Sequence, residues 1–198
     1  KINPELKEIL DQVEFWFEHV NKERIGLNGE PDENEWHTST EYLDSINREE
    51  HIGFPEVAHG ADLVATNSTP TSYRPFITKT LSALNNFFAA KFSAVWMYYP
   101  PGGFMGWHDN HNAHGYNILL SYSKGGNGFF RYQDPETKEI ITLHDKPGWN
   151  IKAGYYGSGK DGDSTYWHCA RTYEERLTFG LVIPDKLLWE LACEDLLA

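Results

Sequence analysis

Cysteine, long apolar runs and basic residues are all scarce in this chain of 198 residues. Its two cysteines, Cys169 and Cys193, are too few for a disulfide framework and lack zinc-site spacing, so we interpret both as reduced thiols. No stretch approaches the 18 or more apolar residues of a membrane span, and the first residues lack the apolar core of a signal peptide. These absences favour a cytoplasmic protein without a membrane partner.

The shortage of basic residues restricts the partners further. Only 17 Lys and Arg stand against 29 Asp and Glu, which gives a formal net charge of −12. A chain with this balance repels a phosphate backbone and gains nothing from counterion release, so we expect no nucleic-acid partner. A small-molecule or peptidyl substrate remains compatible with the charge, and the sequence carries no signal for an oligomeric state.

The residues that are abundant indicate a folded protein. Hydrophobic residues make up 40% of the chain and aromatic residues 15%, far from the composition of a disordered segment. We found no internal repeat and no linker, so we predict a single domain over residues 1–198. Within it we expect helical and irregular support over 1–93, a core over 94–183 and a C-terminal helix over 184–198.

Helical periodicity appears at both ends of the chain. Apolar residues at three- and four-residue spacing predict amphipathic helices over Pro4–Glu23 and Tyr73–Lys91, each with a proline near its start. A short closing helix fits 187–197. The intervening segment 24–71 is rich in polar residues, glycine and proline, and predicts irregular structure with one or two short strands.

Short strands separated by glycine- and proline-containing turns dominate the second half of the sequence. They are expected over residues 94–99, 116–122, 129–132, 139–143, 149–151 and 176–183. This pattern predicts a mainly β fold with flanking helices, in the form of a double-stranded β-helix, that is, a jelly roll of the cupin-like kind.

The segment 97–110, MYYPPGGFMGWHDN, carries the first candidate for chemistry. If this segment is extended around His108, then His108 and Asn110 share one face of the strand while Asp109 points to the other. His168 follows 60 residues later, just before the last long strand. Two histidines and one oxygen donor outline a facial triad with open coordination positions, which is typical of non-haem iron.

The last strand adds a candidate anion receptor. Arg176 and Thr178 fall on one face of it, and a guanidinium binds a carboxylate through two parallel hydrogen bonds to which a hydroxyl adds a third. A metal site with a carboxylate receptor behind it implies a chelating keto acid.

With these residues in place, segment 94–183 resembles the catalytic core of the Fe(II)- and 2-oxoglutarate-dependent dioxygenases. Their prolyl-hydroxylase-like pattern is Tyr-x-x-Gly-x(5)-His-x-Asp, and Tyr99, Gly102 and His108 stand at those spacings. The resemblance covers about 90 residues.

The resemblance implies two cofactors and a reaction. His108 and His168 would hold Fe(II), while Tyr99, Arg176 and Thr178 would hold 2-oxoglutarate. The implied activity is hydroxylation of a C–H bond in a protein side chain or a small molecule. The protein's own share would be to bind, to orient and to exclude water.

The sequence departs from the family pattern at the acidic ligand, where Asn110 stands. Three interpretations remain: Asn110 coordinates as a neutral ligand, it lines a site that water or halide completes, or the backbone twists so that Asp109 takes the position. Strand alternation favours Asn110 over Asp109, whereas metal chemistry favours the reverse. His111 and His114 are near enough to serve as spare ligands, although solvated or hydrogen-bonded histidines fit them better.

The same asparagine keeps a second class of function open. A degenerate jelly roll of the cupin-like kind would bind a small molecule or a partner protein without redox turnover, and a purely structural protein would bind no metal.

Other polar residues are interpreted as structural. We expect His37, His51 and His59 to be surface or hydrogen-bonded residues, and Arg131 and Arg171 to be solvated. Segments 24–34 and 154–164 fit either lids or plain surface loops.

Overall fold

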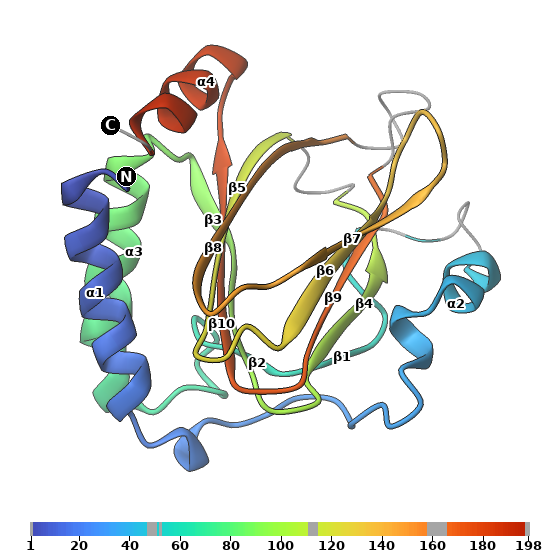
Figure 1. Ribbon diagram of the computed structural model, residues 1–198. Coiled ribbons are helices and arrows are strands. Elements are labelled where there is room, and N and C mark those ends of the chain that lie inside the picture. The colour runs from blue at the N-terminus through green and yellow to red at the C-terminus, as the bar shows by residue number, and fades with distance from the viewer. Residues whose placement is uncertain (1, 47–50, 52, 111–114, 158–165, 197–198) are drawn as a thin grey trace.

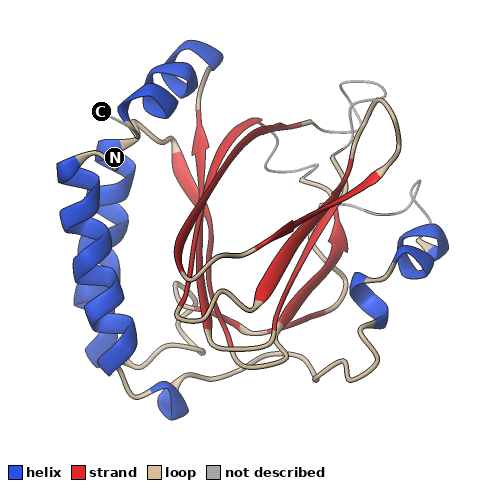
Figure 2. Ribbon diagram, viewed as in Figure 1, coloured by secondary structure: helices blue, strands red, loops and turns tan. Residues whose placement is uncertain are grey.

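The computed structural model describes residues 2–46, 51, 53–110, 115–157 and 166–196. Two five-stranded antiparallel sheets face each other, with helices on their outer sides (Figures 1 and 2). The predicted mainly β architecture with flanking helices is confirmed. No helix among the described residues is long and apolar enough to cross a membrane.

One sheet has the strand order β2-β3-β10-β5-β8, and we call it the helix-backed sheet. Its strands are β2 Ala61–Asp62, β3 Phe92–Tyr99, β5 Gly115–Ser123, β8 Gly148–Tyr156 and β10 Arg176–Ile183. The central strand β10 is buried along its whole length, because β3 and β5 flank it and the helices cover its outer face.

The helices that give this sheet its name are α1 Pro4–His19 and α3 Arg74–Phe87, which stand side by side against it in Figure 1. Asn3 begins α1 by accepting a hydrogen bond from the Glu5 amide, and Pro4 occupies the first turn. The apolar stripe of α1 packs with α3 and the outer face of the sheet into the main core, which contains Leu6, Leu10, Val13, Phe17, Ile77, Leu84, Leu177, Phe179 and Leu181. The helix α4 Lys186–Asp195 closes the same side.

The other sheet has the order β1-β4-β9-β6-β7, and we call it the histidine sheet. Its strands are β1 Ala58–His59, β4 Phe104–His108, β6 Gly128–Gln133, β7 Ile140–His144 and β9 His168–Thr172. Its outer face carries a smaller core built from Leu43, Trp107, Phe129, Trp167 and Cys169. The short helix α2 Thr40–Ser45 contributes Leu43 to this core.

The chain passes between the two sheets in short steps. The sequence from β3 to β10 runs through the sheets in alternation, except that β6 and β7 form a hairpin within the histidine sheet. The β3–β4 link needs glycine at Gly102, which has φ +80°, whereas Gly103 has no space for a Cβ beside the Pro100 carbonyl. Residues far apart in sequence therefore meet between the sheets.

The sequence predicted the helices better than the strands. The three predicted helices are present within a few residues of their expected bounds. The segment 24–71 contains the expected short strands β1 and β2, but also the unpredicted helix α2 and the 3-10 turn η2 Trp36–Thr38. The 3-10 turns η1 Lys22–Arg24 and η3 Thr71–Tyr73 lie at its two ends. Strand β9 was missed, and β4 covers Phe104–His108 rather than the expected extension through Asn110. Strand β8 extends to Tyr156 rather than ending at residue 151.

Candidate functional site

A cavity of about 300 Å³ lies between the two sheets, and all six predicted site residues line it. The histidine sheet contributes His108 and His168, and Asn110 follows β4. The helix-backed sheet contributes Tyr99 from β3 together with Arg176 and Thr178 from β10. The cavity therefore has two imidazole rings on one sheet and a guanidinium with two hydroxyl groups on the other.

The two histidines are direct neighbours across a pair of strands. His108 of β4 lies opposite His168 of β9 in the antiparallel register, and their ring centroids are 4.1 Å apart. The register shifts between Met105 and His108, where β4 advances three residues while β9 advances two. This extra residue is a β-bulge, and it turns His108 to the cavity face that Met105 also occupies.

Backbone carbonyls determine the tautomer of both rings. The Nδ1 atom of His108 lies 2.8 Å from the Gly106 oxygen, and that of His168 lies 2.8 Å from the Tyr166 oxygen. A carbonyl oxygen only accepts, so each Nδ1 carries the hydrogen and each Nε2 keeps its lone pair. This arrangement is the one in which a neutral imidazole binds a metal.

Burial keeps both histidines neutral. It lowers the pKa of His168 to about 4, and it lowers the pKa of His108 well below the usual range, with a further contribution from the neighbouring His168. Each ring therefore offers one nitrogen lone pair, that of Nε2, to a divalent metal at neutral pH.

The second position after the first histidine is held by an asparagine, Asn110. Strand β4 ends at His108, so the alternation expected for residues 108–110 does not apply. Nevertheless Asn110 lines the cavity, while Asp109 is buried at 5% exposure and does not line it. Within the described ranges, no three His, Cys, Asp or Glu side chains lie together closely enough to hold a metal. His111 and His114 lie outside the described residues.

The helix-backed sheet supplies a cation with unused hydrogen-bonding capacity. Arg176 is 1% exposed, and its Nη1 donates to the Phe129 carbonyl at 3.3 Å. Its Nη2 and the Thr178 hydroxyl have no hydrogen-bond partner among the described residues, although both are buried. Buried polar groups without partners are costly, so a ligand that satisfies these two donors gains free energy on binding.

Tyr99 completes this side of the cavity. It is the register partner of Arg176 across β3 and β10, and its hydroxyl contacts only the Met105 sulfur, at 3.9 Å, in the part of the structure described. Burial raises the pKa of Tyr99 far above its usual value, although Arg176 opposes this effect. The hydroxyl therefore stays protonated and serves as a donor.

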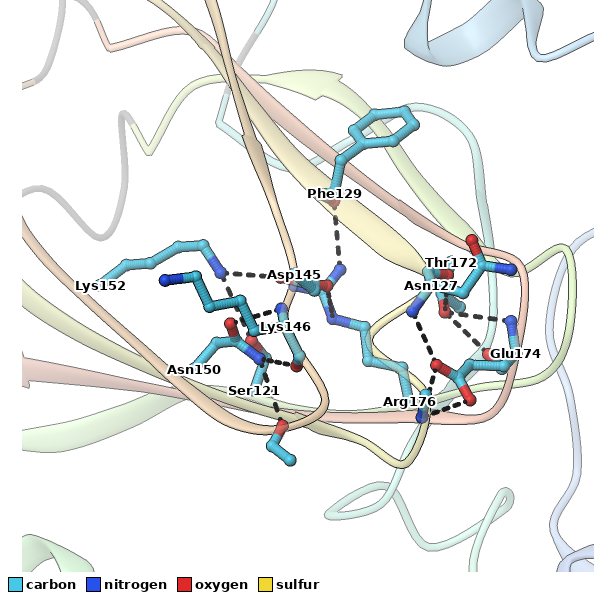
Figure 3. Close-up of polar contacts among 12 residues, drawn as sticks. Ser121, Asn127, Phe129, Asp145, Lys146, Asn150, Lys152, Thr172, Glu174 and Arg176 are labelled. Carbon is cyan, nitrogen blue, oxygen red and sulfur yellow. Dashed lines mark hydrogen bonds and ion pairs between the residues drawn. The ribbon is translucent and has the colours of Figure 1, made fainter.

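Two charged residues behind Arg176 were not predicted. Asp145 lies in the link between β7 and β8, with one oxygen 3.4 Å from Arg176 Nε and the other 3.0 Å from Lys152 Nζ (Figure 3). No sequence motif marks them, because Lys152 is a single cation within β8 and Asp145 lies in the short segment between β7 and β8. Only the pairing of strands brings them to Arg176.

Two expectations about surrounding residues were wrong. His51 was expected at the surface or hydrogen-bonded, but it is 8% exposed, packs on Trp167, and neither ring nitrogen has a partner among the described residues. Arg171 was expected in solvent, but it is 4% exposed and pairs with Asp32 and Glu35 at 3.7 Å. Both are buried because the N-terminal segment covers the histidine sheet.

Other expectations about the surroundings have mixed outcomes. His37 bonds Asp32, and His59 bonds the Gly29 carbonyl, as expected for structural histidines. Arg131 is half-buried rather than solvated and donates to the Thr38 carbonyl. Segment 24–34 does not line the cavity, and most of 154–164 lies outside the described residues.

Comparison with known proteins does not assign this chain to a family. No protein-family model and no curated protein matches this sequence. Among solved structures, a prolyl-4-hydroxylase from Pseudomonas putida aligns with 91% of this chain and 100% of its own at 13% identity, with a TM-score of 0.38. A score at this level supports no argument about fold or activity.

Proposed function

We propose that this protein is a non-haem Fe(II)- and 2-oxoglutarate-dependent dioxygenase that hydroxylates a C–H bond of a protein side chain or a small molecule. One observation carries the proposal: two imidazoles that keep a lone pair on Nε2, and a buried arginine whose Nη2 has no hydrogen-bond partner among the described residues, line the same cavity. The alternation of strands between two facing sheets fits the jelly roll on which such sites are built.

The metal would be held by His108 and His168, with the Asn110 carboxamide oxygen as the third protein ligand. Imidazole suits iron, whereas a neutral oxygen adds no charge to the site, so we expect weaker metal binding than in a site with a carboxylate. When bound, iron and 2-oxoglutarate would activate oxygen for attack on the C–H bond.

The keto acid would be oriented from the opposite sheet. Arg176 Nη2 and the Thr178 hydroxyl would bind its distal carboxylate, and the Tyr99 hydroxyl would donate a further hydrogen bond. Most of the remaining cavity lining is apolar and includes Leu119 and Phe130, with Asp62 and Asn117 as polar exceptions. The apolar side chains would exclude water from the reacting centre and hold the ligand between the sheets.

The test is an anaerobic titration of the protein with Fe(II) and 2-oxoglutarate, followed through the visible metal-to-keto-acid charge-transfer band. We expect a band that is lost in His168→Ala and in Arg176→Ala. His19→Ala on the outer helix α1 and Arg24→Ala on the surface are the matched controls, because both residues are exposed. Both controls should retain the band.

A second candidate function is a binding module without turnover, and the missing carboxylate favours it. Under this alternative no band appears in the wild-type protein at high metal and keto-acid concentrations. If Asn110→Asp then produced the band, the cavity would be a dioxygenase site that has lost its metal rather than one that never bound it.

A further inference from the structure

Three charged side chains lie in a row beside the cavity, where the chain crosses from one sheet to the other. The side chains of Asp145 and Arg176 are each 1% exposed, and that of Lys152 is 13% exposed. Asp145 stands in the middle and contacts both cations, each through a different oxygen (Figure 3). A buried row of this kind is costly to desolvate, and a hydrophobic arrangement would stabilise the fold at least as well.

The row determines how the Arg176 guanidinium is oriented. Its Nε atom faces Asp145 at 3.4 Å, and its Nη1 donates to the Phe129 carbonyl at 3.3 Å. A guanidinium is planar, so contacts at two of its three nitrogens fix the direction of the third. Nε has the Asp145 ion pair but no hydrogen bond, whereas the third nitrogen, Nη2, has neither an ion pair nor a hydrogen bond among the described residues.

The charges of the row do not cancel. Two cations and one carboxylate leave one positive charge, and no other acidic side chain in the described ranges pairs with Arg176 or Lys152. Lys152 is also held within 3.5 Å of the Ser121 hydroxyl. Burial lowers the pKa of Lys152, and Asp145 opposes that shift. One unbalanced buried charge fits one carboxylate group.

We propose that Asp145, held in place by Lys152, is a positioning residue for Arg176, directing Nη2 at the distal carboxylate of the keto acid. This inference rests on the proposed function. The competing explanation is that Asp145 only neutralises a buried arginine. The two explanations predict opposite changes in the Kd for 2-oxoglutarate when Asp145 is substituted.

The substitution is Asp145→Asn, studied by calorimetric titration with 2-oxoglutarate and with Mn(II) in place of iron to prevent turnover. Loss of a positioning group weakens binding, and we expect the Kd to rise about tenfold, as for other residues that orient a ligand-binding group. Neutralisation alone predicts a lower Kd, because the net charge of the row rises from one to two. A lower or unchanged Kd would overturn the inference.

Two controls separate positioning from a general loss of structure. The keto acid 2-oxobutyrate lacks the distal carboxylate, so its Kd should change less than about twofold in the same variant if the chelating end of the site is intact. The double variant Asp145→Asn/Lys152→Met restores a net charge of one and removes two buried charges together. Positioning predicts that it still binds 2-oxoglutarate weakly, whereas charge balance predicts wild-type affinity.

A structural measurement keeps the inference distinct from the proposed function. In a ligand-free crystal structure of Asp145→Asn, we expect the Arg176 guanidinium to rotate so that Nη2 no longer faces the cavity. An unmoved guanidinium overturns the inference, whatever the wild-type protein binds. Conversely, a wild-type protein that binds no keto acid, together with a rotated guanidinium in the variant, overturns the proposed function and supports the positioning of Arg176.

Discussion

The two sheets equip their shared cavity in different ways. The histidine sheet presents neutral rings, and each ring is oriented by one hydrogen bond to a backbone carbonyl two residues earlier. The helix-backed sheet presents a cation, which is oriented by a carboxylate from the link between the sheets. Neutral groups are thus oriented locally, whereas the charged group depends on residues distant in sequence.

The difference follows from the cost of burial. A neutral imidazole with its one N–H satisfied is inexpensive to bury, and a local carbonyl suffices. A guanidinium loses much more hydration, so it needs an opposite charge within the protein. The buried guanidinium lies on the helix-backed sheet, which has the larger core and is covered by α1 and α3.

The largest expected effect tests which sheet holds the fold together. Phe179 of β10 is 0% exposed in the main core, so Phe179→Ala should lower the free energy of unfolding by about 4 kcal/mol. Ile140 of the edge strand β7 is only half-buried, and Ile140→Ala should cost about 1 kcal/mol. Urea denaturation measures both. Equal losses would mean that the histidine sheet contributes as much as its partner.

The next effect concerns the neutral rings. The pKa of His168 is about 4 in the fold and near 6.5 in the unfolded chain, so below pH 6.5 the unfolded state binds more protons and stability falls. Between pH 7 and pH 4 this contribution is of the order of 3 kcal/mol. The metal-free wild type should therefore lose more stability with acid than His168→Gln does.

A matched control for this pH effect is Tyr99→Phe on the other sheet. Tyr99 has no proton to gain in that range, because burial raises its pKa. Its stability curve should run parallel to that of the wild type. A parallel curve for His168→Gln as well would contradict the neutral state assigned to the ring.

A smaller effect is expected at Asn110, the second residue after the end of β4 at His108. Asn110→Asp adds a negative charge beside two neutral rings, so Fe(II) or Mn(II) affinity should rise about tenfold. The control is Asp109→Asn, because Asp109 does not line the cavity. If only the Asp109 variant changed the affinity, the metal ligand would be Asp109 after all.

The smallest effect on stability is expected in the link between β3 and β4. Gly102 has φ +80° and nothing within 4 Å of an added Cβ, so Gly102→Ala should cost about 1 kcal/mol through backbone strain alone. Gly102→Asn should cost less, since asparagine tolerates this conformation. Thermal melting measures both. A loss in Gly102→Asn as large as in Gly102→Ala would indicate a contact that the structure does not contain.

Local sequence patterns were sufficient for part of this protein. The amphipathic spacing that begins at Pro4 and Tyr73 predicted α1 and α3, because helical contacts repeat within a few residues. The face shared by Arg176 and Thr178 followed from strand alternation, and both residues line the cavity. Strand alternation predicted that Asn110 shares the face of His108, and Asn110 does line the cavity. Alternation is not the cause, however, because β4 ends at His108 and Asn110 lies outside the strand.

The sequence by itself therefore determined the three main helices, most of the strands, the two candidate histidines and the cation on the last strand. Only the tertiary structure decided the bulge that turns His108 to the cavity, the burial of His51 and Arg171, and the row that joins Arg176 to Lys152 through Asp145. The physical reason is range: periodicity reflects contacts a few residues apart, whereas strand register and the pairing of buried charges depend on residues that meet only when the sheets form.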